Sequence, residues 1–237
     1  MEEATAPHAY GLPGSNELLP AHNSHAMIVF VDIRGFTAWS QHVTPSLLTE
    51  FLTHFYAQLH GAFPGTYIKT MGDGALIIHG VPIPATMDAV TVLLTQLLRQ
   101  VGDVERQFQG LRSVFELQYG ATVLLALGWG IVRGIITELR SPDLDIHDYV
   151  GAEINKASRL CALARPQGVM IDAADFPLVP TLAADSLWGQ AVSVAHQTFL
   201  PQEHLLKGVA EPIHAWALLT MNTTGTLLTE AESPGPA

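Results

Sequence analysis

Two aspartates, each at the end of an apolar stretch, are the residues best placed to do chemistry in this sequence. Asp32 follows the run over residues 27–31, and Asp73 follows residues 67–70 within Met-Gly-Asp-Gly. A carboxylate at the end of a buried strand is costly to desolvate unless a cation compensates its charge. If the two strands lie side by side, Asp32 and Asp73 also repel each other, and a shared metal ion removes that repulsion. The sequence therefore predicts a divalent-metal site between these strands.

A second candidate pair lies on a helix predicted over residues 149–164. Asn155 and Arg159 are four positions apart and share one face of that helix. An amide and a guanidinium that face the same way suit a phosphoryl group on which charge develops. Helical Asn and Arg at this spacing are more often surface residues, so the pair gains weight only in combination with the aspartates.

The apolar pattern predicts the elements that must position these residues. Their order is strand, helix, strand, strand, helix and strand, followed by a further helix and strands, which is the split βαβ arrangement. The predicted class is α+β, with a ferredoxin-like, antiparallel-rich sheet covered by helices on one face. The expected elements are a strand over 27–31, a helix from Thr44 to Pro64, a hairpin of 66–70 with 75–81, a helix over 85–108, a strand pair of 115–127 with 129–136 around Gly128 and Gly130, a polar loop over 143–147, the helix over 149–164, and strands over 169–172 and 211–219.

Composition excludes several classes of partner. The 237 residues are 48% hydrophobic and 14% charged, which is typical of one folded domain, and the net charge of −11 disfavours nucleic acid and anionic membranes as partners. A single cysteine excludes an intrachain disulfide and, without a cationic leader or membrane-spanning run, favours the cytoplasm. We expect a flexible leader over 1–25, a catalytic domain over 26–220 and a flexible tail over 221–237.

The whole set of motifs resembles the class III nucleotidyl cyclases, the family of adenylyl and guanylyl cyclase catalytic domains. The resemblance covers residues 27–218. It rests on four stretches in the family's order: Phe30-Val-Asp-Ile-Arg-Gly-Phe-Thr37, Lys69-Thr-Met-Gly-Asp73, Gly128-Trp-Gly-Ile-Val-Arg-Gly134 and Asp148-Tyr-Val-Gly-Ala-Glu-Ile-Asn-Lys-Ala-Ser-Arg-Leu160.

The resemblance implies roles for individual residues. Asp32 and Asp73 are similar to the family's metal-binding aspartates, which hold two Mg²⁺ or Mn²⁺ ions together with a backbone carbonyl, here that of Ile33. Asn155 would position the ribose, and Arg159 would stabilise charge on the α-phosphate. The triphosphate would be held by the amides of Gly35, Phe36 and Thr37, at a helix start that suits anions, and by Lys207.

The resemblance also implies a reaction and an assembly. The ribose 3′-hydroxyl would attack the α-phosphorus in line and expel pyrophosphate. Lys69 and Asp148 match the residue pair of the family's adenine-selective members, whereas guanine-selective members carry Glu and Cys there. The chain is thus expected to be an adenylate cyclase that makes 3′,5′-cyclic AMP from ATP. Because the metal residues and the Lys69 group face each other across a subunit interface in such enzymes, we expect a homodimer with two shared sites.

Two alternatives stay open at the sequence level. We expect no regulatory domain before or after the catalytic region, and the family's short stand-alone members include the pyrimidine cyclases of bacterial antiphage defence, which make cyclic UMP or cyclic CMP. The other alternative, from another class, is a non-catalytic nucleotide-binding module. Loss of a metal aspartate would favour such a module, but Asp32 and Asp73 are both present.

Overall fold

The described part of the protein forms one sheet with helices on it. The computed structural model describes residues 22–81, 86–120, 123–141, 146–176, 200–206 and 211–219. The elements are β1 (His22–Arg34), α1 (Phe36–Ser40), α2 (Pro45–Ala62), β2 (Tyr67–Met71), β3 (Gly74–Gly80), α3 (Met87–Tyr119), β4 (Ala126–Ser141), β5 (Ile146–Val150), α4 (Ala152–Leu163), β6 (Gly168–Asp172), β7 (Leu200–His204) and β8 (Ile213–Leu219).

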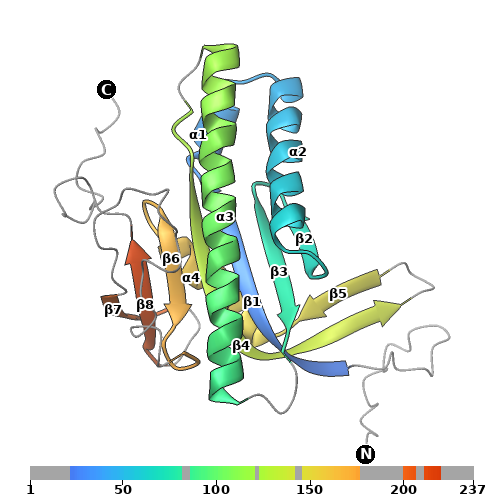
Figure 1. Ribbon diagram of the computed structural model, residues 1–237, viewed down its shortest axis with the longest axis vertical. Coiled ribbons are helices and arrows are strands. Elements are labelled where there is room, and N and C mark those ends of the chain that lie inside the picture. The colour runs from blue at the N-terminus through green and yellow to red at the C-terminus, as the bar shows by residue number, and fades with distance from the viewer. Residues whose placement is uncertain are drawn as a thin grey trace, which may run out of the picture.

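The strand order confirms the split βαβ arrangement. The strands lie in the order β2-β3-β1-β4-β6-β8-β7, and β5 pairs with the C-terminal part of β4 (Figure 1). The order β2-β3-β1-β4 is that of a ferredoxin-like unit, with each pair antiparallel. Only β4 and β6 are parallel among the described pairs. The predicted α+β class is therefore confirmed.

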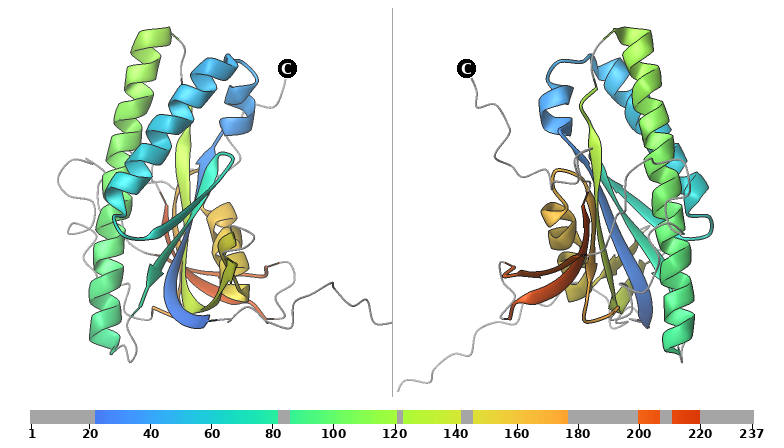
Figure 2. Two further views of the ribbon diagram at one scale, coloured as in Figure 1. Left: turned by 90° about the vertical axis from the view of Figure 1, so that its right-hand side faces the viewer. Right: turned by 60° about the vertical axis from the view of Figure 1, so that its left-hand side comes forward.

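The helices cover both faces of the sheet, so the expectation of a single covered face was wrong. Successive residues of β1 point to opposite faces, and they join two separate apolar cores. Val29 and Val31 pack with the aromatic side chains of α2 and α3. Ile28 packs on the other face with Ala157 and Leu160 of α4. Figure 2 shows α2 and α3 on one side of the sheet and α4 on the opposite side.

The segment after residue 108 also differs from the sequence prediction. We expected a strand over 115–127, but α3 continues to Tyr119 because Phe108, Leu111 and Phe115 extend its buried face at helical spacing. The helix ends at Gly120, whose φ of 65° is left-handed. Gly128 and Gly130 lie inside the continuous strand β4 rather than at a hairpin turn.

The glycines of β4 give α4 its place on the sheet. A Cβ at Gly130 would lie 2.1 Å from the Ala157 carbonyl oxygen and 2.3 Å from the Cys161 nitrogen, and a Cβ at Gly134 would lie 2.4 Å from Glu153 Cγ. Because every other residue type carries a Cβ, only glycine at position 130 allows the helix backbone to come this close, whereas Gly134 leaves space for the Glu153 side chain.

Several boundaries are set by the structure. β1 begins at His22, four residues before the expected domain start, and α4 begins at Ala152 rather than at residue 149. β5 includes His147, which we expected in a loop, and β7 had no sequence prediction. The expected leader up to residue 21, the tail over 221–237 and Lys207 lie outside the described residues. None of the described helices is long and apolar enough to cross a membrane.

The close contact of α4 gives a first prediction. Gly130→Ala should lower the free energy of unfolding by about 2 to 3 kcal/mol, because the new methyl group overlaps the α4 backbone. Gly110→Ala is the matched control, since a Cβ at Gly110 in α3 would meet no atom within 4 Å. That control should keep or raise stability by up to about 1 kcal/mol. Chemical denaturation measures both, and equal effects of the two variants would contradict this packing.

An ionisable side chain of α3 is held against the core. The Trp129 indole N–H donates a 2.7 Å hydrogen bond to Glu105 Oε1, and the Trp129 side chain is fully buried. Burial raises the pKa of Glu105 from its ordinary 4.5 to about 7, although the Trp129 hydrogen bond and the charge of Arg112 oppose the rise. The folded protein therefore holds this proton more tightly than the unfolded chain does.

This proton gives a second prediction, on pH. Since the folded-state pKa is raised, ionisation of Glu105 lowers stability progressively from about pH 4.5 to about pH 7. Glu105→Gln keeps an acceptor for Trp129 and removes the charge, so it should be more stable than wild type by about 1 to 3 kcal/mol at pH 8. The difference should shrink as the pH falls to about 4.5. Thermal unfolding across this range measures it, and a pH-independent difference would contradict the prediction.

Candidate active site

Asp32 and Asp73 lie next to each other at one end of the sheet. β1 and β3 are antiparallel neighbours, and Asp32 is paired with Gly74. The Ile33 amide donates a 3.1 Å hydrogen bond to the Asp73 carbonyl oxygen. A Cβ at Gly74 would lie 2.6 Å from the Val31 carbonyl oxygen, so only glycine lets the β2–β3 turn approach β1 here. The structure therefore brings the two aspartates together, as the sequence predicted.

The Asp32 carboxylate has too little positive charge near it to offset the effect of its burial. Burial is the largest influence and raises the pKa of Asp32, Arg34 lowers it, and the charge of Asp73 raises it again. The net effect is a pKa above the ordinary value. Asp32 and the neighbouring Asp73 carboxylate together fit a divalent cation, which favours the ionised form of Asp32. No group of three or more His, Cys, Asp or Glu side chains suited to a metal exists among the described residues.

Arg34 joins the aspartate end of β1 to α4. Its Nη1 lies 2.6 Å from Asp32 Oδ2, and its Nη2 donates to the carbonyl oxygen of Cys161 and lies 3.6 Å from the Cys161 sulfur. A Cβ at Gly128 would lie 2.1 Å from Arg34 Nη2, so the guanidinium occupies the space that this glycine leaves. From the sequence, Arg34 was expected either to touch phosphate or to be solvated. Its position two residues after Asp32, on the same strand face, was the available signal for the observed contact.

Three of the residues predicted to hold a triphosphate come directly after Arg34 in the sequence. Gly35 has a left-handed φ of 77° and precedes α1, which starts at Phe36 and contains Thr37. The first amides of a helix lack acceptors within the helix, so these groups are available to an anion. Lys207, the remaining predicted triphosphate contact, lies outside the described residues.

Lys69 and Asp148 form an ion pair, although they are distant in sequence. Lys69 Nζ in β2 lies 2.5 Å from Asp148 Oδ2 in β5, and the two side chains are 43% and 30% exposed. Burial alone would raise the pKa of Asp148, but hydrogen bonds from Lys69, the Tyr149 amide and Tyr67 outweigh it and hold that pKa below its ordinary value. Asp148 is therefore an ionised acceptor at neutral pH, beside a donor.

An aromatic group that sequence reasoning missed surrounds this ion pair. The Tyr67 hydroxyl lies 3.2 Å from Asp148 Oδ1 and 3.2 Å from the His147 carbonyl oxygen. The Tyr67 ring packs against those of Tyr149 and His147, with ring centroids 4.8 and 5.2 Å away. The available signal was the spacing of Tyr67 and Lys69, since residues two apart in a strand share a face.

Asn155 and Arg159 lie on α4, with Asn155 exposed and Arg159 half-buried. Among the described residues, neither side chain has a hydrogen-bond or ion-pair partner, Asp32 and Asp73 included. The Lys69–Asp148 pair likewise has no described bond to either aspartate. The predicted residues thus form two separate groups in one chain, the aspartates and the Lys69–Asp148 pair, with α4 presenting two unpaired polar side chains.

The neighbouring Lys156 forms ion pairs within the protein. We expected Lys156 and Glu153 to face solvent or a dimer interface, but Lys156 Nζ lies 2.7 Å from Glu153 Oε2 and 2.7 Å from Asp172 Oδ2. Asp172 is 1% exposed and also accepts a hydrogen bond from the Ala174 amide. Burial would lower the pKa of Lys156, but its two carboxylate partners raise it instead. This buried ion pair ties α4 to β6.

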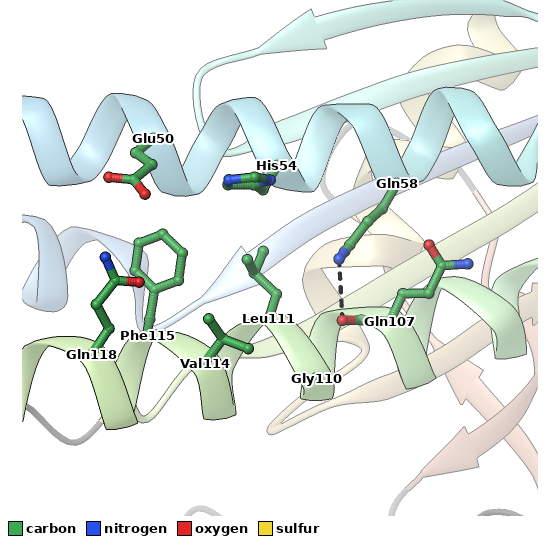
Figure 3. Close-up of a pocket in the computed structure, with 9 residues that line it drawn as sticks. All are labelled: Glu50, His54, Gln58, Gln107, Gly110, Leu111, Val114, Phe115 and Gln118. Carbon is green, nitrogen blue, oxygen red and sulfur yellow. Dashed lines mark hydrogen bonds between the residues drawn. The ribbon is translucent and has the colours of Figure 1, made fainter.

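One groove in the described structure lies away from all of these residues. It has a volume of about 380 Å³ and runs between α2 and α3, on the sheet face opposite α4 (Figure 3). Gln58 of α2 donates a 3.1 Å hydrogen bond across it to the Gln107 carbonyl oxygen. Because none of the predicted catalytic residues lines this groove, it has no part in the candidate chemistry.

Comparisons with known proteins fit this arrangement. The family model described as the adenylate and guanylate cyclase catalytic domain matches residues 20–175. The chain is 26% identical over 166 residues to the pH-sensitive adenylate cyclase MT1302 of Mycobacterium tuberculosis (strain CDC 1551 / Oshkosh), a match that covers 68% of this chain and 32% of that protein. The chain thus spans about a third of the length of this relative.

Two solved structures share the fold. The adenylyl cyclase CyaB from P. aeruginosa has a TM-score of 0.67 at 20% identity, with 86% of this chain and 98% of that chain covered. The guanylyl cyclase Cya2 has a TM-score of 0.63 at 18% identity, with 88% and 99% covered. An adenylyl and a guanylyl cyclase are thus similarly alike in fold, so the fold does not distinguish the two substrates.

The chain belongs to the adenylate and guanylate cyclase catalytic domain family. Its class is therefore that of the class III nucleotidyl cyclases, lyases that act on nucleoside triphosphates with divalent metal ions.

Proposed function

We propose that this protein is an adenylate cyclase that converts ATP into 3′,5′-cyclic AMP and pyrophosphate. The observation that carries the proposal is the ion pair between Lys69 and Asp148, 2.5 Å apart. In the family that this chain resembles, this residue pair accompanies adenine selectivity. A site whose polar groups are built to pair with one base leaves them unpaired with another, and such sites discriminate by about 10⁴ to 10⁵.

The aspartate end of β1 would hold the metal ions. Asp32 and Asp73 fit this role because they are neighbours, and because the pKa of Asp32 is raised by burial and by the charge of Asp73. Two Mg²⁺ or Mn²⁺ ions held there, with the Ile33 carbonyl as a further ligand, would lower the pKa of the ribose 3′-hydroxyl and neutralise phosphate charge.

The remaining residues would position the nucleotide. Amides of Gly35, Phe36 and Thr37 would hold the triphosphate at the start of α1, with Lys207 as a further contact. Asn155 would orient the ribose so that its 3′-oxygen lies in line with the α-phosphorus and pyrophosphate leaves on the opposite side. Arg159 would stabilise the charge that develops on the α-phosphate oxygens. Arg159 suits this task because it has no partner among the described residues.

We further propose a homodimer in which each site takes its aspartates from one chain and the Lys69, Asp148, Asn155 and Arg159 group from the other. The separation of these residues into two groups supports such sharing, because no described bond joins them within one chain. A two-fold symmetric dimer then contains two equivalent sites.

The first alternative is a pyrimidine cyclase that makes cyclic UMP or cyclic CMP. It would use the same metal and transition-state residues and differ only in base recognition. The second alternative, a non-catalytic nucleotide-binding module, is disfavoured because both aspartates are present and adjacent.

A nucleotide panel tests the proposal. Full-length protein with Mn²⁺ or Mg²⁺ should convert ATP to cyclic AMP with a kcat/KM at least about a hundredfold above that for GTP, UTP or CTP. Product analysis by mass spectrometry measures this. Product from UTP or CTP alone would establish the pyrimidine alternative, and no product from any nucleotide would favour the non-catalytic module.

Complementation tests the shared site. Asp32→Ala and Asn155→Ala chains should each be inactive, since each defect falls in both sites of its homodimer. Unfolded together and refolded in equal amounts, they should recover about a quarter of wild-type activity, because half of the dimers are mixed and each mixed dimer has one intact site.

The matched control mixes Asp32→Ala with Asp73→Ala. Both substitutions affect the same half of the site, so a mixed dimer has no intact site and activity should stay absent. Equal outcomes for the two mixtures would contradict the shared-site arrangement.

A further inference from the structure

The two oxygens of the Asp148 carboxylate have different surroundings. Oδ1 accepts the Tyr149 amide at 2.8 Å and the Tyr67 hydroxyl at 3.2 Å. Oδ2 accepts Lys69 Nζ at 2.5 Å, its one hydrogen bond among the described residues. A carboxylate oxygen accepts about two hydrogen bonds. Oδ1 is therefore filled by the protein, while Oδ2 keeps one accepting position open beside the Lys69 ammonium.

An aspartate side chain alone does not hold its carboxylate in this orientation. The terminal torsion of Asp is broad, so the plane of the carboxylate can tilt unless hydrogen bonds prevent it. The Tyr149 amide belongs to the backbone of β5, whereas the Tyr67 hydroxyl comes from β2, the strand that also carries Lys69. Tyr67 is therefore the side chain that fixes Asp148 relative to Lys69.

The ring of Tyr67 is itself held in place. It meets the rings of Tyr149 and His147 at angles of 71° and 63°, in edge-on contacts that leave little freedom for reorientation. Its hydroxyl proton is shared with the His147 carbonyl oxygen at 3.2 Å, which directs it toward β5. Burial and the Asp148 charge raise the pKa of Tyr67 to about 12, so the hydroxyl remains a donor at every physiological pH.

We propose that Tyr67 is a specificity-determining positioning residue, which locks the Asp148 carboxylate so that Oδ2 and the Lys69 ammonium meet the nucleotide base as one fixed acceptor–donor pair. This inference rests on the proposed function, in which these two residues read the base. Without the hydroxyl, the carboxylate plane can tilt, and the open accepting position of Oδ2 no longer keeps a fixed direction beside the Lys69 ammonium. The site then loses discrimination between bases rather than the ability to catalyse.

The test compares full-length wild type with Tyr67→Phe, which keeps the packed ring and removes only the hydroxyl. For each of ATP, GTP, UTP and CTP, kcat and KM are measured. The ratio of kcat/KM for the preferred nucleotide over each other nucleotide should fall about tenfold in Tyr67→Phe, through a rise in KM with kcat nearly unchanged. An unchanged ratio would overturn the inference, and so would wild type that accepts all four bases equally.

Tyr119→Phe is the matched control. Tyr119 also donates from its hydroxyl to a carboxylate, Glu50 Oε2 at 3.0 Å, but does so at the far end of α3. Its removal should leave the nucleotide ratios within about twofold of wild type. Circular dichroism and the melting temperature establish that both variants are folded, and an equal loss of discrimination in both would overturn the inference.

A double-mutant cycle separates positioning from a general structural role. If Tyr67 acts through Asp148, then Tyr67→Phe should change the nucleotide ratios of an Asp148→Asn protein by less than about twofold. Additive effects of the two substitutions would show that Tyr67 acts independently of Asp148, which contradicts the proposal.

A measurement without nucleotide tests the inference even if the proposed function is wrong. Wild type that cyclises no nucleotide contradicts the cyclase assignment, yet the Asp148 carboxyl can still be titrated by NMR. Because the Tyr67 hydrogen bond helps to hold the pKa of Asp148 down, that pKa should rise in Tyr67→Phe and stay unchanged in Tyr119→Phe. An unchanged pKa in Tyr67→Phe would overturn the inference.

Discussion

The close approach of α4 to β4 is the constraint on which the rest of the candidate site depends. At Gly130 the helix backbone occupies the space that a Cβ would need, 2.1 Å from the Ala157 carbonyl oxygen. Such an approach fixes the height and rotation of α4 over the sheet, because a packed interior has no space to absorb a shift. Asn155 and Arg159 inherit their positions from this contact. The two residues are four positions apart on one helix, so the backbone position of each is set by the position of α4.

Two electrostatic contacts also stabilise the position of α4 on the sheet. At one end of the helix, Lys156 pairs with Asp172, whose side chain is 2% exposed. Near the other end, Arg34 reaches from β1 to the Cys161 carbonyl oxygen through the space above Gly128. A buried charge without its partner is strongly destabilising, so both contacts resist displacement of the helix. Since Arg34 also binds Asp32, the Asp32 carboxylate and the helix are mechanically connected within one chain.

Sequence reasoning predicted the proximity of Asp32 and Asp73 more reliably than the elements between the candidate site residues. Asp32 and Asp73 were predictable because a carboxylate at the end of an apolar strand is chemically unusual wherever that strand lies. The hairpin around Gly128 was wrong because glycine in an apolar run has two meanings, a turn or a close backbone approach. Only the position of α4, a tertiary fact, distinguishes them. The expectation of one covered face failed for the same reason, since residues 27–31 are apolar at every position and so fit burial on both faces.

The contacts that escaped prediction are those between residues distant in sequence. Tyr67 meets Asp148 across 81 positions, and Arg34 meets Cys161 across 127. No local spacing encodes such pairs, although Asp148 in the first pair was a predicted site residue. The few cations of this protein, whose net charge is −11, are used in different ways. Of the two cations on α4, Lys156 is neutralised by two carboxylates, whereas Arg159 has no partner in the described structure. An acidic protein that binds a polyanion must keep its few unpaired cations where the anion's charge develops. The ion pairs of α4 are compatible with that requirement, because they anchor the helix through Lys156 and leave Arg159 available.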